Sequence, residues 1–229
     1  MVTHGTEAII PNLLIPKDYF FDDNNKIFGI WLSGGVDSSI LCYLLAKHIL
    51  DNNLDFKIQP VTIFKNKRTS NYNDVINFIK KSLNCEDLFL EPIVKDREDD
   101  DEYTAFFNLN YSNIVSKKYK YIYSGINATP DNEHYTDTWK PIPELEQVRN
   151  SYIKKLLVIN CVIEIDNTLY EFGEIKPFFN LDKKEIAKLY RQHNLLDTLF
   201  PLTISCITEI SHCGECWFCK ERIWGFGKL

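Results

Sequence analysis

No apolar run in the sequence approaches the roughly 20 consecutive residues that a helix needs to span a bilayer. The first residues, MVTHGTEAIIPNLLIPKDYF, also lack a basic start followed by an apolar block of about 7–15 residues, so they do not have the pattern of a signal peptide. These absences argue against a membrane protein and predict a cytoplasmic one.

Basic residues are also in deficit. The chain has 26 lysines and arginines against 32 aspartates and glutamates, which leaves a net charge of −6. Proteins that wrap a nucleic-acid backbone usually present a strongly basic face. The charge balance therefore argues against nucleic acid as the partner, although a small local basic patch stays open.

Two common phosphate-binding motifs are missing, yet a glycine-bearing turn stands where such motifs occur. In WLSGGVDSS (31–39) no lysine follows the glycines and no G-x-G-x-x-G is present, which excludes the P-loop and the dinucleotide fingerprint. The turn joins an apolar run to a helical pattern, and helix N-termini attract anions through their unpaired N–H groups. Together with the serine hydroxyls, this predicts a phosphate or pyrophosphate site, with Asp37 as the helix N-cap or a magnesium holder. A plain strand–helix turn is the alternative.

Apolar runs alternate with helical patterns along the chain. Such alternation predicts an α/β fold with a parallel, twisted sheet flanked by helices. The predicted strands are 26–33, 56–64, 88–96 and 121–127; the predicted helices are 37–53, 73–84, 103–118, 146–157 and 181–196; and 128–145 reads as a loop. The division we expect is an arm (1–25), a nucleotide-binding domain (26–200) and a cysteine-bearing segment (201–229).

Cysteines are unevenly distributed. Cys42, Cys85 and Cys161 have apolar neighbours and are predicted to lie in the core. The other four, Cys206, Cys213, Cys216 and Cys219, follow the spacing C-x6-C-x2-C-x2-C. Four thiolates at this spacing suit a tetrahedral, structural Zn²⁺ site. A redox pair and an iron–sulfur cluster are the alternatives, and the adjacent His212 is left out of the ligand set.

The motifs resemble known families. LSGGVDSS (32–39) is similar to the SGGxDS signature of the PP-loop ATP pyrophosphatases, which cleave ATP between its α and β phosphates. The C-terminal pattern resembles that of the 7-cyano-7-deazaguanine synthases of queuosine biosynthesis: Ser205-Cys206, Cys213-Gly214-Glu215-Cys216, Cys219, Arg222 and Gly225-Phe226. SGIN (124–127) also matches a stretch of that family.

The resemblance implies a Rossmann-like fold of the adenine-nucleotide alpha-hydrolase type and a C–N ligase that uses ATP, Mg²⁺ and ammonia on 7-carboxy-7-deazaguanine. Asp37 and Ser38 would be catalytic, Gly125, Asn127 and Arg222 would contact the acid, and a surface ion pair is the alternative for Arg222. The residues expected to hold ATP or its pyrophosphate are Ser33, Gly34, Gly35, Val36, Asp37, Ser38, Ser39, Thr62 and Phe64.

The sequence departs from the family in two places. Phe64-Lys65-Asn66 stands where the family usually has Tyr-Gly-Gln, and 128–145 lacks its Asp-Cys-Arg-Pro motif. A PP-loop enzyme that adenylates a different acceptor, such as a tRNA base, another acid or a protein terminus, is therefore the first alternative. A zinc-knuckle binding module without catalysis is the second. Whether the chain forms a homodimer stays open, as does whether the product is the amide or the nitrile.

Overall fold

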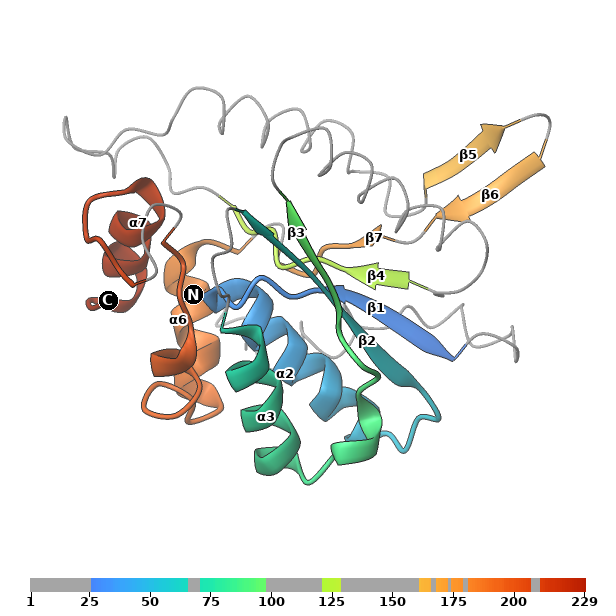
Figure 1. Ribbon diagram of the computed structural model, residues 1–229, viewed down its shortest axis with the longest axis horizontal. Coiled ribbons are helices and arrows are strands. Elements are labelled where there is room, and N and C mark those ends of the chain that lie inside the picture. The colour runs from blue at the N-terminus through green and yellow to red at the C-terminus, as the bar shows by residue number, and fades with distance from the viewer. Residues whose placement is uncertain are drawn as a thin grey trace, which may run out of the picture.

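The computed structural model describes residues 26–65, 71–97, 121–128, 161–165, 168–172, 174–178, 181–206 and 211–229. Its centre is a five-stranded sheet in the order β3-β2-β1-β4-β7 (Figure 1), and every neighbouring pair is parallel. The strands are β1 (Ile27–Trp31), β2 (Lys57–Lys65), β3 (Ile93–Arg97), β4 (Tyr121–Tyr123) and β7 (Glu174–Ile175). The predicted α/β class with a parallel sheet is confirmed.

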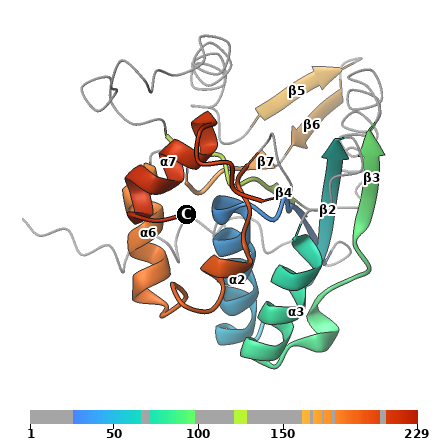
Figure 2. The same cartoon turned by 60° about the vertical axis from the view of Figure 1, so that its left-hand side comes forward.

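Helices pack below the sheet in Figure 1. They are α2 (Val36–Asp51), α3 (Tyr72–Leu83) and α6 (Lys183–Gln192), with the single turns η3 (Glu86–Leu88) and η5 (Phe200–Leu202). The last helix, α7 (Trp217–Phe226), lies against the N-terminal part of α6 (Figure 2). The helices α2, α3 and α6 thus form the layer that covers one face of the sheet.

The burial of each helix follows from its sequence. Helix α2 is buried over most of its length because VDSSILCYLLAKHILD has apolar or small residues on nearly every face. Helix α3 is amphipathic, and the predicted residues Val75, Ile76 and Ile79 form its buried face. Helix α6 begins with the predicted capping box, in which the Asp182 carboxylate accepts from backbone N–H groups and the Glu185 side chain accepts from the Asp182 N–H.

An antiparallel hairpin of β5 (Cys161–Ile165) and β6 (Thr168–Phe172) was not predicted. The sequence did contain a hint, because CVIEI and TLYEF are rich in β-branched and aromatic residues and flank Asp166-Asn167, residue types that are common in turns. The predicted arm (1–25), the predicted helices 103–118 and 146–157 and most of the predicted loop (129–145) lie outside the described residues.

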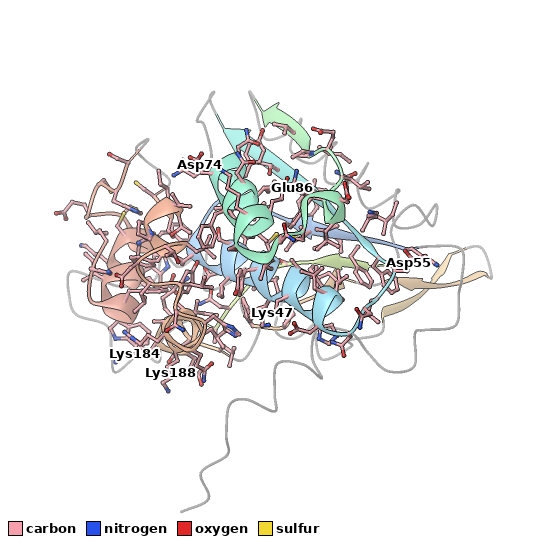
Figure 3. The ribbon with its side chains drawn as sticks, turned by 90° about the horizontal axis from the view of Figure 1, so that it is seen from below. Lys47, Asp55, Asp74, Glu86, Lys184 and Lys188 are labelled. Atoms are coloured by element: carbon pink, nitrogen blue, oxygen red, sulfur yellow. The ribbon has the colours of Figure 1, made fainter. Side chains whose placement is uncertain are left out.

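Charged side chains lie on the outer surface of the helical layer. Figure 3 looks at this layer from below and labels Lys47 on α2, Asp74 on α3, and Lys184 and Lys188 on α6. None of the helices within the described ranges combines the length and apolar character needed to cross a membrane.

Candidate functional site

The glycine turn lies at the point where the sheet order reverses. After β1 the chain continues outward through β2 and β3 on one side, whereas β4 and β7 lie on the other. Residues 32–35 therefore leave the carboxyl end of β1 beside the carboxyl end of β4. Open α/β sheets bind ligands in the crevice at such a switch point, so the topology gives the turn the location of a ligand site.

Gly34 cannot be replaced without strain. Its φ is +75°, a left-handed conformation that L side chains rarely adopt, and a Cβ here would lie 3.0 Å from the Asn71 backbone nitrogen. Gly35 has extended backbone and is the N-cap of α2. The two glycines thus let the chain turn sharply from β1 into α2, close to the start of α3.

The first turn of α2 has no side-chain cap. Its N-cap is Gly35, which has no side chain to accept a hydrogen bond from the first N–H groups of the helix. The prediction of Asp37 as N-cap is therefore wrong: the N-cap is Gly35, two residues earlier, and the helix begins at Val36, which places Asp37 within the first turn. Because amides at a helix N-terminus carry partial positive charge, this uncapped turn can receive an anion.

Two serine hydroxyls meet at the turn. Ser33 Oγ lies 3.0 Å from Ser38 Oγ and accepts a hydrogen bond of 3.3 Å from the Gly35 N–H. The Ser38 hydroxyl also donates to the Gly35 carbonyl at 3.3 Å. Ser39 is fully buried, and its Oγ has no hydrogen-bond partner among the described residues. The predicted serines are thus clustered around the turn, and their contact with phosphate stays a prediction.

Asp37 belongs to a buried charge cluster that was not predicted. Its Oδ2 lies 2.5 Å from Lys183 Nζ, and the same ammonium lies 3.3 Å from Glu221 Oε2. The side chains of Lys183 and Glu221 are 3% and 1% exposed, against 23% for Asp37. In the sequence, LDKKE reads as the solvated start of a helix, so only the three-dimensional structure identifies Lys183 as a buried cation.

Asp37 also has a second buried oxygen. Its Oδ1 makes no hydrogen bond within the part of the chain that the structure describes. A buried carboxylate oxygen normally has a partner, and a carboxylate oxygen is a preferred ligand of Mg²⁺. The carboxylate can therefore bind Lys183 through one oxygen and offer the other to a cation.

SGIN (124–127) lies beside the first turn of α2, as its predicted position at the end of the fourth strand requires. A Cβ on Gly125 would be 2.8 Å from the Ser38 nitrogen and 2.9 Å from the Asp37 carbonyl carbon. Asn127 is 5% exposed, and its Nδ2 donates to the Ala128 carbonyl at 3.2 Å. The glycine allows β4 to approach the turn closely, while contact of Gly125 and Asn127 with a substrate stays a prediction.

Thr62 supports the turn from β2. Its hydroxyl donates to the Leu32 carbonyl at 2.7 Å, and the residue is 1% exposed. The Thr62 hydroxyl therefore holds the end of β1, and its contact with adenine stays a prediction. Phe64 lies near the carboxyl end of β2, in register with Asp96 of β3.

Arg222 is buried rather than exposed. Its guanidinium donates to Thr203 Oγ1 at 2.8 Å and to the Phe200 carbonyl at 3.1 Å, and lies 3.9 Å from the centre of the Phe200 ring. Burial lowers the pKa of the Arg222 guanidinium to about 10, so it remains charged at neutral pH. Because Arg222 is only 1% exposed, the alternative of a surface ion pair is wrong. Its hydrogen bonds instead hold α7 against residues 200–203. Contact with a substrate stays a prediction.

The four C-terminal cysteines are clustered as predicted. The sulfurs of Cys206, Cys213, Cys216 and Cys219 all lie within 4.8 Å of one another, and two of the pairs are 3.9 Å apart. Burial and the neighbouring sulfurs raise the pKa of the Cys219 thiol to about 12. A cation would offset that cost, so the cluster could hold a metal ion. His212 Nδ1 lies 4.0 Å from Cys219 Sγ, at the edge of the cluster.

The cysteine segment contacts the glycine turn directly. The Ile204 N–H donates to the Gly34 carbonyl at 3.0 Å, and Asn71 Nδ2 donates to the Leu202 carbonyl at 2.9 Å. Ser205, which immediately precedes Cys206, has its Oγ 3.8 Å from where a Cβ on Gly35 would lie. This hydroxyl is buried and has no hydrogen-bond partner among the described residues. Ser205 is therefore a further polar group at the turn, which the sequence did not single out as a site residue.

Residues 104–229 match the model of the family described as Queuosine biosynthesis protein QueC. No curated protein matches the chain.

Solved structures with a similar fold include a U34-tRNA thiolase, NcsA, from Methanococcus maripaludis with its [4Fe–4S] cluster (13% identity, TM-score 0.47). The alignment covers 82% of this chain, which spans only 63% of the thiolase. Another is an NMN synthetase from Francisella tularensis (12% identity, TM-score 0.45, covering 97% of this chain and 84% of that one). A third is an NAD+ synthetase from Burkholderia pseudomallei (12% identity, TM-score 0.43, covering 97% and 80%). Likeness at this distance carries no argument about activity.

Proposed function

Because the chain belongs to the family of the queuosine biosynthesis protein QueC, we propose that it uses ATP and ammonia to convert 7-carboxy-7-deazaguanine into 7-cyano-7-deazaguanine. Family membership supports ATP-dependent adenylation chemistry. The observation that carries the proposal is the uncapped first turn of α2, which lies at the switch point of the sheet and directly beside SGIN.

The reaction has two activations. In the first, a carboxylate oxygen of the acid attacks the α-phosphorus of ATP, the bond to the β-phosphate oxygen breaks, and pyrophosphate leaves. Ammonia then attacks the acyl carbon, AMP leaves with the former carboxylate oxygen, and a proton is released to give the amide. In the second, the amide oxygen attacks the α-phosphorus of another ATP and pyrophosphate leaves again; the adenylated amide then loses AMP and, in all, two protons from its nitrogen to give the nitrile.

The chain's own residues bind the leaving group and orient the acceptor. The amides after Gly35 and the hydroxyls of Ser33, Ser38 and Ser39 would hold the pyrophosphate. Lys183 would offset its negative charge from behind Asp37. Gly125 and Asn127 would bring the acid to within reach of the α-phosphorus, because β4 ends against the first turn of α2. Thr62 and Phe64, near the carboxyl end of β2, would border the adenosine.

A magnesium ion would fit at Asp37. The carboxylate oxygen that does not face Lys183 is buried and has no hydrogen-bond partner among the described residues, as suits a ligand of a hard cation. Bound there, Mg²⁺ would neutralise part of the charge on the phosphates.

For the cysteine cluster we propose Zn²⁺ as a structural ion. Tetrahedral zinc with bonds of about 2.3 Å places its sulfur ligands roughly 3.8 Å apart, and two pairs here lie at 3.9 Å. In a [4Fe–4S] cluster each cysteine binds a different iron, so the sulfurs would be spread further apart. Residues 201–229 would then be a metal-stabilised segment that closes the nucleotide-binding domain (26–200). The absorption spectrum of the purified protein separates the two, because zinc gives no visible band.

The test of the reaction is acid-dependent turnover. Purified full-length protein is incubated with Mg·ATP, ammonium and 7-carboxy-7-deazaguanine, and AMP and product mass are followed. We expect AMP release that requires the acid and a product with the mass of the nitrile. Ser82→Ala on α3, away from the turn, is the control that keeps activity. AMP release at background level with the acid present would contradict the proposal.

A different acceptor is the second candidate, favoured by the missing Asp-Cys-Arg-Pro motif and by Phe64-Lys65-Asn66. The same assay, with tRNA or other carboxylic acids in place of the deazapurine, identifies it by AMP release. A protein that binds zinc but neither binds nor cleaves ATP would instead support the non-catalytic zinc-knuckle alternative.

A further inference from the structure

Glu221 has no part in the chemistry described so far, although it is one of the most buried charged residues in the described structure. Its side chain is 1% exposed, and its Oε2 lies 3.3 Å from Lys183 Nζ. It is on α7, two residues after the cluster cysteine Cys219. Lys183 therefore joins a carboxylate of the C-terminal helix to the carboxylate of the glycine turn.

We propose that Glu221 is a positioning residue for ATP binding: it holds Lys183 beside the turn while Asp37 binds the Mg²⁺ that accompanies ATP. The inference rests on the proposed function, because it requires Asp37 to act on Mg·ATP. Glu221 itself need not touch the nucleotide.

The two carboxylates that face Lys183 differ in how well they are fixed. Asp37 is 23% exposed and is in the first turn after the glycines, where a ligand would bind. A Mg²⁺ ion bound to Asp37 would compete with the Lys183 ammonium for the negative charge of this carboxylate. With Asp37 as its sole counter-charge, Lys183 would be left poorly compensated in a buried position at the moment when ATP arrives.

Glu221, in contrast, is on a rigid support. Gly225 packs so closely on α6 that a Cβ there would lie 2.5 Å from Lys183 Cγ and 2.7 Å from the Lys183 carbonyl oxygen. Arg222, the next residue, is fixed to Thr203 and Phe200 by hydrogen bonds. Helix α7 cannot shift along α6 without breaking these contacts. Glu221 is therefore the carboxylate that can stay on Lys183 when Asp37 exchanges partners.

Removing one partner of a buried ion pair is destabilising in itself, because the other charge is left uncompensated. If Glu221 only joined α7 to α6, its removal would lower thermal stability and leave the affinity for ATP unchanged. If it positions Lys183, its removal weakens ATP binding in a protein that is still folded. The two roles are thus separable.

The experiment compares Glu221→Gln with Glu215→Gln in the full-length, metal-loaded protein. Glu215 is in the same cysteine segment, but its side chain is 88% exposed and lies 3.9 Å from Lys220. Binding of Mg·ATP without acceptor is measured by calorimetry, and the KM for ATP and for the acid together with kcat are measured by AMP release. Melting temperature is recorded for each variant.

We expect Glu221→Gln to raise the Kd and the KM for Mg·ATP about five- to tenfold, the lower part of the range for a group that acts on a ligand through another residue. The KM for the acid should be unchanged, and Glu215→Gln should behave as the unmodified chain does. Glu221→Met, which has a similar volume and no charge, should show the same loss of affinity for Mg·ATP. It replaces the Gln variant in the experiment if that variant does not fold.

Unchanged ATP affinity in folded Glu221→Gln or Glu221→Met overturns the inference and leaves the proposed reaction standing. Failure of the unmodified protein to bind Mg·ATP overturns both. If the protein binds Mg·ATP but the acid does not stimulate AMP release, the result counts against the proposed acceptor only, since the binding measurement uses no acceptor.

Discussion

The glycine turn and the cysteine cluster lie side by side, yet the backbone supplies the binding groups of the first and side chains supply those of the second. At the turn the backbone supplies the anion-binding groups, and the side chains are mostly absent or small: Gly34, Gly35 and the serines. At the cluster four cysteine side chains are brought to within 4.8 Å of one another. A backbone site depends on a permitted conformation, whereas a side-chain site depends on the presence of every ligand. Substitutions should therefore affect the two regions in different ways.

The largest effect is expected from loss of a cluster cysteine. Structural zinc sites contribute on the order of ~10 kcal/mol of apparent binding free energy, so Cys213→Ser should lose the metal and strongly destabilise residues 203–229. Metal content and denaturant unfolding measure this. Cys85→Ala removes a buried thiol outside the cluster, so full metal content is expected. Equal metal loss in both variants would show that the cluster is not the binding site.

The next largest effect is expected where the two regions meet. Lys183→Met leaves the buried carboxylate of Glu221 and the partly buried carboxylate of Asp37 without their shared cation, which should lower the free energy of unfolding by about 3–5 kcal/mol. The neighbouring Lys184 is exposed, with its Nζ 4.5 Å from the centre of the Trp224 ring. Lys184→Met should change stability by less than about 1 kcal/mol. Urea unfolding of both variants tests the difference, and equal stability would refute the buried role of Lys183.

Gly34→Ala should show that the turn depends on backbone conformation. The left-handed φ costs a non-glycine residue about 1–2 kcal/mol, and the new Cβ would also press on the Asn71 backbone at 3.0 Å. We expect a loss of about 2 kcal/mol together with weakened Mg·ATP binding. Gly227 has nearly the same φ, +76°, but a Cβ there would meet nothing within 4 Å. Gly227→Ala should therefore cost only the conformational part and leave calorimetric ATP affinity intact.

The smallest effect is expected from Ser38→Ala. This change removes a hydroxyl that bonds Ser33 Oγ and the Gly35 carbonyl, worth about 1 kcal/mol, and ATP affinity should fall roughly fivefold, the equivalent of such an energy. Ser82→Ala on α3, which loses a hydrogen bond of 3.2 Å to the Ile79 carbonyl, should leave the Kd unchanged. If Ser38→Ala also binds ATP normally, the backbone amides alone hold the phosphates.

Local patterns predicted much of the fold. The apolar run before the glycines, the amphipathic pattern of α3 and the Asp182–Glu185 capping box all correspond to elements within the described residues. The hairpin of β5 and β6 was missed, although its strands are rich in β-branched and aromatic residues. The N-cap of α2 was predicted two residues late, because Asp37 is a favourable N-cap by residue type, whereas the extended Gly35 is the N-cap in the structure.

At the candidate site, the motif residues were found and their connections were not. SGGVDSS and the cysteine spacing could be recognised because both are local sequence patterns. Lys183 and Glu221 could not, because a lysine beside a helix cap and a glutamate between Lys220 and Arg222 are typical of surface residues. Ser205 could not, because only the packed chain brings its hydroxyl to the glycine turn. Arg222 was expected at a substrate or at the surface, and the structure shows its guanidinium buried against Phe200.

By itself the sequence determined the parallel α/β class, the glycine turn with its hydroxyls and the set of four sulfur ligands, because each depends on residue types at short range. The tertiary structure alone decided that these two sites adjoin and that Lys183 lies between Asp37 and Glu221. That charge cluster unites three residues far apart in the chain. The attraction between its charges is strong because burial removes water as a competing partner, and burial is a property of the packed chain rather than of any local pattern.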